Sequence, residues 1–187
     1  MNKFFEFVSR FTTLSAQSRE ALSEIAERQA LPKGYLLLRP GTVCHYIYFV
    51  EAGLTRTFYS KDEKDVTDWF SAENSFACSV MSFISQQPDR RAIELLEPSV
   101  LWAFHYDNLE RLYTRYHEIE HLGRHLVNFG VIQMQQRFDS LHFASAYERY
   151  HALLKDQPGI IQRAPLGTIA SYLGITQETL SRIRSQQ

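Results

Sequence analysis

Hydrophobic positions divide the chain into a region of short alternating runs and a region of helical repeats. Residues 14–30 have apolar positions at helical spacing, and Pro32 and Gly34 end that pattern. Short apolar or alternating runs follow, separated by Gly, Pro, Asn and Asp, at residues 35–38, 45–50, 54–59, 66–70, 92–96 and 100–104. Short strands at nearly regular spacing predict an antiparallel barrel or roll.

Helical spacing dominates the second half of the chain. It predicts helices at residues 106–116 and 117–141, and a further short helix is predicted earlier, at residues 76–84, between two of the strand runs. The longest helix has two apolar stripes, so one stripe can pack on its own domain and the other on a second copy of the chain. A single buried helix is the alternative. One stripe contains Val127, Val131, Met134, Phe138 and Leu141. We expect the other to form the dimer interface, through Ile119, Leu122, Leu126, Phe129 and Gln133.

The C-terminal part of the chain contains the most informative pattern. A helix is predicted at residues 145–154, and a short strand at 159–162 is a further expectation. Two short amphipathic helices then flank Gly174, which supplies the positive φ of a tight turn, and Thr176 is suited to cap the second helix. A small apolar core joins them, formed by Ile169, Ala170, Leu173, Ile175, Leu180 and Ile183. This layout predicts a helix-turn-helix.

The outer face of the second helix has side chains that can contact base edges. Arg182 can pair with guanine O6 and N7, and Glu178 can accept from cytosine N4. Gln177 and Ser181 can reach bases or phosphates. The alternative is a helix-turn-helix used only for packing. The predicted DNA-binding residues are Thr176, Gln177, Glu178, Ser181 and Arg182.

Composition narrows the choice of partners. With 44% hydrophobic residues, the 187-residue chain can bury a core. Its net charge of -1 excludes a uniformly basic protein that coats nucleic acid. Residues 145–187 contain five Lys and Arg against three Asp and Glu, a mild bias towards a polyanion. No signal core or uncharged stretch of about 18 residues is present, so we expect a cytoplasmic protein without a membrane partner.

Evidence for catalysis is weak. His117-Glu118-Ile119-Glu120-His121 matches H-E-x-x-H, and a zinc hydrolase using His117 and His121 is therefore one alternative. A charge within the motif and the lack of a third ligand favour a solvated helix face. Cys44 and Cys78 match no metal motif, and nucleotide or hydrolase signatures are absent. We expect no enzyme, no metal and no cofactor.

Two motifs give the chain a resemblance to the CRP/FNR superfamily of transcription regulators over essentially its whole length. Residues 31–54, with Tyr48-Phe49-Val50, are similar to the family's P-x-G…G…Y-F-V-x-x-G pattern. Residues 172–182 are similar to its G-[hydrophobic]-[ST]-x-E-T-[hydrophobic]-x-R recognition motif.

The resemblance implies an α+β fold with three parts. These are a sensor β-roll (1–116), a long dimerisation helix (117–142) and a helix-turn-helix domain (143–187). It also implies a homodimer on an inverted repeat of double-stranded DNA, with RNA polymerase as a further partner. Glu178 and Arg182 would make the main base contacts, with Ser181 accessory.

The sequence departs from the cyclic-AMP pattern of this family. The Gly-Glu-Leu of the phosphate cassette aligns with Ser79-Val80-Met81, which lacks the Glu that would bind the ribose hydroxyl. We therefore expect an effector other than cyclic AMP; a degenerate sensor that needs no ligand is the alternative. The resemblance gives as candidate ligand residues Arg90, Arg91, Met134 and Gln135. Arg90 and Arg91 would otherwise be an exposed basic pair.

The sequence stops five residues after Arg182, earlier than the family pattern. A minimal helix-turn-helix and a shortened chain both fit this length. A sensor or scaffold that does not bind DNA is the remaining alternative.

Overall fold

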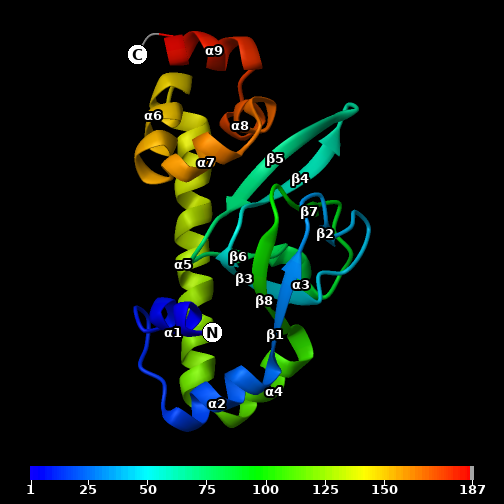
Figure 1. The fold of residues 1–187 in the computed structure, drawn as a ribbon, viewed down its shortest axis with the longest axis vertical. Helices are drawn as coiled ribbons and strands as arrows, with labels where there is room; N and C mark the ends of the chain where they lie inside the picture. Colours follow the sequence, from blue (N-terminus) through cyan, green and yellow to red (C-terminus); the bar gives the residue numbers. More distant parts are fainter. Residues whose placement is uncertain (186–187) are drawn as a thin grey trace.

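The computed structural model of the protein describes residues 1–185 and shows a β-roll beside one long helix (Figure 1). The strands are β1 (Ala26–Leu31), β2 (Leu36–Leu38), β3 (Tyr46–Ala52), β4 (Thr55–Lys61), β5 (Lys64–Ser71), β6 (Phe76–Ala77), β7 (Ala92–Leu95) and β8 (Ser99–His105). The helices are α1 (Asn2–Val8), α2 (Ala16–Ile25), α3 (Val80–Ser85), α4 (Tyr106–Arg115), α5 (His117–Phe143), α6 (Ala146–Asp156), α7 (Pro158–Arg163), α8 (Leu166–Leu173) and α9 (Gln177–Ser185). Helix α5 follows the long axis of the molecule, with α6–α9 at one end and α2 and α4 at the other.

The roll consists of two antiparallel four-stranded sheets with the orders β1-β8-β3-β6 and β2-β7-β4-β5. One buried cluster lines its interior, formed by Leu38, Cys44, Tyr48, Val50, Ala77, Ile93, Leu95, Leu101 and Ala103. The six strands expected from the alternating runs are confirmed as β2, β3, β4, β5, β7 and β8. The expected α+β class with an antiparallel roll is therefore confirmed.

Three local expectations are wrong. The helix expected at residues 14–30 ends at Ile25, because residues 26–31 pair along β8 as strand β1. The helix expected from Phe76 begins at Val80, because Phe76 and Ala77 pair with β3. Residues 159–162 lie in α7 rather than in a strand, with Pro158 in its first turn, where the missing N–H costs nothing.

The N-terminal half of α5 is part of the chain's own core. Ile119 and Leu122 are only 1% and 3% exposed, in one cluster with apolar side chains of α1, α2, α4, β3 and β8. Leu126 packs against that cluster, and the Phe129 ring lies 5.5 Å from the Phe11 ring. Gln133 is half-buried. The expectation that Ile119 and Leu122 face a second copy is therefore wrong, since their own domain encloses them.

The other stripe of α5 is left exposed. Its members are between 41% and 59% exposed, namely Val127, Val131, Met134, Phe138 and Leu141. The two apolar stripes predicted from the sequence are both present on α5, and the structure leaves exposed the one that was expected to pack on the chain's own domain. No helix within residues 1–185 is long and apolar enough to cross a membrane.

Candidate DNA-binding helix-turn-helix

The turn between α8 and α9 forms as its residues demand. Gly174 ends α8 in the left-handed region, at φ 66°, where a side chain would be strained. The Ile175 N–H donates to the Ala170 carbonyl at 3.0 Å, which closes the turn. Thr176 Oγ1 accepts from the Thr179 N–H at 3.2 Å and so caps α9. The expected glycine turn and threonine cap are both present.

A small core fixes α8 and α9 against the rest of the domain. Helix α6 begins with a capping box in which Ser145 and Glu148 exchange hydrogen bonds. The Arg149 Nε donates to the Leu173 carbonyl at 2.9 Å and ties α6 to the end of α8. The buried apolar residues of this core are Tyr150, Leu153, Ile160, Ile169, Ala170, Leu173, Leu180 and Ile183.

The exposed side of α9 presents the polar residues that the sequence singled out. All five lie exposed around the start and along the outer face of the helix: Thr176, Gln177, Glu178, Ser181 and Arg182. The pKa of Glu178 is lowered, first by its own backbone N–H and then by the Thr176 hydroxyl. Its carboxylate is therefore charged at neutral pH and can accept hydrogen bonds. One helix face thus offers a cation, an anion, an amide and a hydroxyl group.

Sequence reasoning missed Arg163, which joins this domain to the roll. Its guanidinium Nη1 lies 3.0 and 2.9 Å from the two Glu73 oxygens, and its Nη2 lies 3.2 Å from Glu97 Oε1. Nη2 also donates to the Gly53 carbonyl at 2.9 Å, while the Gly53 N–H donates to Glu73 at 2.9 Å. Arg163, Glu73, Glu97 and Gly53 are hereafter called the Arg163 cluster. No local pattern signals it, because its members lie far apart in the sequence.

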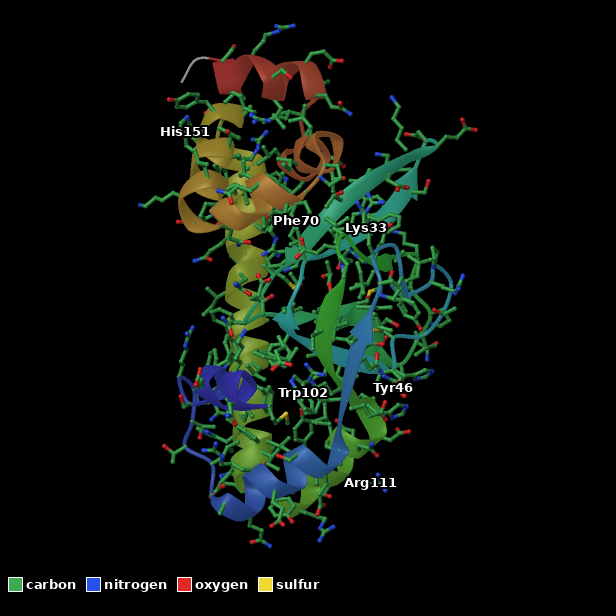
Figure 2. The ribbon with its side chains drawn as sticks, viewed as in Figure 1. Lys33, Tyr46, Phe70, Trp102, Arg111 and His151 are labelled. Carbon is green, nitrogen blue, oxygen red and sulfur yellow. The ribbon has the colours of Figure 1, made fainter. Side chains whose placement is uncertain are left out.

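Further contacts hold α8 against the β4–β5 hairpin. Ser171 Oγ accepts from the Thr67 N–H at 2.9 Å and donates to the Asp65 carbonyl at 3.2 Å. The Tyr172 ring lies 5.0 Å from the ring of Phe70, which Figure 2 labels beside these helices. A cavity of about 350 Å³ remains between the two parts, lined by Arg56, Asp65, Thr67, Pro165, Gly167, Thr168, Ser171 and Gln177. Helix α8, on which α9 packs, is therefore tied to the hairpin of the roll.

Solved structures share this arrangement of roll, long helix and C-terminal helices. FixK2 from Bradyrhizobium japonicum matches with a TM-score of 0.72 and 19% identity, over 87% of this chain and 84% of its own. A protein from Eubacterium rectale described as a transcriptional regulator of the CRP/FNR family matches with a TM-score of 0.68 and 17% identity, over 91% and 82%. The catabolite activator protein of Thermus thermophilus matches with a TM-score of 0.59 and 19% identity, over 94% and 84%. The chain has the CRP/FNR fold. No protein-family model and no curated protein matches the sequence.

Within this CRP/FNR fold, three of the four candidate ligand residues contact other side chains of the chain itself. Arg91 Nε lies 2.7 Å from Asp68 Oδ2, and its Nη1 lies 3.4 Å from both Asp89 oxygens. Arg90 is exposed, with its guanidinium carbon 4.8 Å from the centre of the Tyr59 ring. On α5, Met134 is exposed and Gln135 donates to Asp139 at 2.8 Å.

Asp89 places a carboxylate beside one of the candidate ligand arginines. Its buried carboxylate accepts from the hydroxyl of Ser79, which precedes α3, and faces Arg91. Burial raises the pKa of Asp89, but the hydrogen bonds from Ser79 and from the Arg91 N–H, together with the Arg91 charge, outweigh it and lower the pKa. The chain therefore supplies its own anion at this point of the roll, and no sequence pattern had indicated it.

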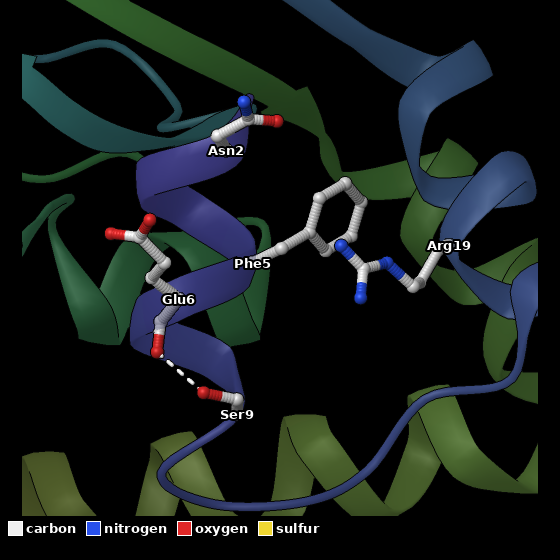
Figure 3. A pocket seen from close by; sticks show the side chains of 5 residues that line it. All are labelled: Asn2, Phe5, Glu6, Ser9 and Arg19. Carbon is white, nitrogen blue, oxygen red and sulfur yellow. Dashed lines mark hydrogen bonds between the residues drawn. The ribbon is translucent and has the colours of Figure 1, made fainter.

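The hollow between α1 and α2 contains none of the predicted site residues (Figure 3). It measures about 280 Å³ and is lined by Asn2, Phe5, Glu6, Ser9 and Arg19. The Arg19 guanidinium lies 4.4 Å from the centre of the Phe5 ring, so these two side chains form a cation–π contact with each other.

The H-E-x-x-H sequence does not form a zinc-protease site in the described residues. The rings of His117 and His121 are 6.3 Å apart, and His117 Nδ1 lies 3.2 Å from Glu120. Within residues 1–185 no group of three or more His, Cys, Asp and Glu could hold a metal ion. The hydrolase alternative thus lacks a ligand set in this part of the chain.

Proposed function

We propose that the protein is a sequence-specific DNA-binding transcription regulator of the CRP/FNR type that works in the cytoplasm. The observation that supports this most is the exposed polar face of α9 on a packed helix-turn-helix. Arg182 suits guanine, and Glu178 suits cytosine, so neighbouring base pairs could be distinguished in the major groove. The fold supports the same proposal, since the matching proteins from Eubacterium rectale and Thermus thermophilus carry regulator descriptions.

The proposal includes a homodimer on an inverted repeat. The exposed stripe of α5 is the surface we assign to the partner helix, because its five apolar side chains repeat at coiled-coil spacing. A twofold axis along α5 would set two α9 helices about 34 Å apart, one turn of DNA. The target would then be palindromic, with half-sites one turn apart.

The effector of this regulator is proposed to be something other than cyclic AMP. Asp89 already pairs with Arg91, one of the two candidate ligand arginines, and a cyclic phosphate bound beside it would meet a like charge, which carries a free-energy cost. The same observation favours a second candidate, a regulator whose roll needs no ligand. A thermal-shift screen separates the two candidates. A small molecule that raises the melting temperature supports a regulator with an effector, whereas a screen in which no compound raises it supports a regulator that needs no ligand.

Selection of bound sequences from a random DNA pool tests the proposed function. The wild-type chain should enrich an inverted repeat, and Arg182→Ala should lose about ten- to one-hundred-fold in affinity for it, as expected for a bidentate base contact. Arg111→Ala is the matched control, since Arg111 is also exposed but lies on α4 at the opposite end of the molecule (Figure 2). No enriched sequence, or the same affinity with Arg182→Ala, would contradict the proposal.

A further inference from the structure

Two histidines of α5 approach each other closely. His121 and His125 lie one helical turn apart, on the same face of the helix. Their Nε2 atoms are separated by 3.3 Å, and their ring centroids by 4.4 Å. Both side chains are half-exposed, so solutes can reach them. The base-contacting residues proposed above all lie on or beside α9, at the other end of α5.

This separation is the one that a shared metal ion requires. Zinc bound to histidine nitrogens at about 2.0–2.1 Å in tetrahedral geometry sets two such nitrogens roughly 3.3–3.4 Å apart. The two Nε2 atoms therefore stand at chelating distance without the ion. An N–H···N hydrogen bond also fits 3.3 Å, but it uses one ring proton, whereas chelation needs both lone pairs. Metal titration separates these two uses of the pair.

The pair differs from the one that the H-E-x-x-H pattern suggested. His117 stands apart from it, since its ring lies 6.3 Å from that of His121 and its Nδ1 faces Glu120 at 3.2 Å. With no third ligand among the described residues, the chain supplies two nitrogens and leaves the other positions to water. Two imidazoles suit Ni²⁺, Cu²⁺ and Zn²⁺, which bind nitrogen ligands most tightly in their row.

We propose that His121 and His125 form a two-histidine site for a late first-row divalent transition metal ion. An ion there would join two successive turns of α5 and so favour the helical state of this segment. Because the ion binds the folded helix better than the unfolded chain, occupancy raises stability. The site would respond to free zinc, nickel or copper independently of any effector in the roll.

Calorimetric titration of the full chain without an affinity tag tests the site, with ZnCl₂ and NiCl₂ as the probes. The wild type should bind one ion per chain, or one per two chains if a second copy completes the shell, and its melting temperature should rise. His121→Gln and His125→Gln should each weaken binding at least tenfold. His117→Gln and His142→Gln are the matched controls on the same helix and should bind like the wild type.

Circular dichroism of each variant without metal verifies that the helix content is unchanged. Retention of wild-type affinity in either His121→Gln or His125→Gln would overturn the proposal. So would a loss confined to His117→Gln and His121→Gln, which would assign the metal to the H-E-x-x-H pair. Absence of saturable binding at millimolar metal concentrations would also overturn the proposal, because the contact between His121 and His125 would then be a hydrogen bond only.

Discussion

Asp89 shows how one side chain can change the chemistry of the roll. It is the buried carboxylate between Ser79 and Arg91, and its pKa lies below the usual value because these partners outweigh the effect of burial. A group whose pKa is lowered by folding stabilises the native state at pH above its unfolded pKa. That contribution is lost as the pH falls through the lowered, folded pKa.

We expect Asp89→Asn to lower the free energy of unfolding at pH 7 by about 1–3 kcal/mol, since a charged hydrogen-bond partner is lost. The deficit should shrink at strongly acidic pH, where wild-type Asp89 is itself protonated. Urea unfolding at pH 7 and at strongly acidic pH measures this difference in the free energy of unfolding. Asp156→Asn, at an exposed position on α6, is the control and should match the wild type. A deficit that is equal at both pH values would contradict the assignment.

Residues of the candidate site differ in how far the sequence could predict them. Glu178 and Arg182 could be predicted, because the exposed face of a short amphipathic helix depends only on local spacing. Asp89 and Arg163 could not, because their roles depend on partners brought close by folding. Arg163 and Glu73, for example, are 90 positions apart.

Helices and strands also differ in whether local sequence or distant partners determine them. Strands such as β4 and β5 could be predicted from alternation, since each has one face towards the interior. Strand β1 could not, because Ala26–Leu31 contains good helix formers and becomes a strand only by pairing with β8. The two stripes of α5 were visible in the sequence, but their partners depend on which helices cover the first stripe.

The exposed stripe of α5 makes a prediction about assembly. Val131→Glu would place an unpaired charge in the proposed helix–helix contact, at a cost of several kcal/mol. We expect the variant to sediment as a monomer at concentrations where the wild type is a dimer, and to lose affinity for palindromic DNA. Gln136→Glu adds the same charge to another exposed face and should remain dimeric. A dimeric Val131→Glu would refute the assignment of this stripe.

At the scale of the whole molecule, the roll and the C-terminal domain share one buried cluster. Leu54, Phe70 and Leu96 of the roll region belong to the same cluster as Leu173 and Leu180 of the helix-turn-helix. The Arg163 cluster and the contacts of Ser171 lie along the same boundary. A change in the β4–β5 hairpin therefore has a direct physical route to α9, through packing and hydrogen bonds.

The Arg163 cluster is the part of this boundary that a single substitution can open. Arg163→Ala leaves the half-buried carboxylates of Glu73 and Glu97 without their cation, and hydrogen bonds to charged groups contribute about 1.5–3 kcal/mol each. We expect faster amide hydrogen exchange in α7, α8 and the β4–β5 hairpin, while β1, β3 and β8 keep wild-type rates. DNA affinity should change together with exchange, because α9 is then held less firmly.

Lys155→Ala removes an exposed cation from α6 and serves as the control for charge. Glu73→Gln should reproduce part of the effect, since an amide can still accept from Arg163 but carries no charge. If Arg163→Ala left exchange unchanged on both sides of the boundary, the apolar cluster alone would hold the domains together. If exchange rose equally in every strand of the roll, Arg163 would stabilise the whole fold rather than the joint between its parts.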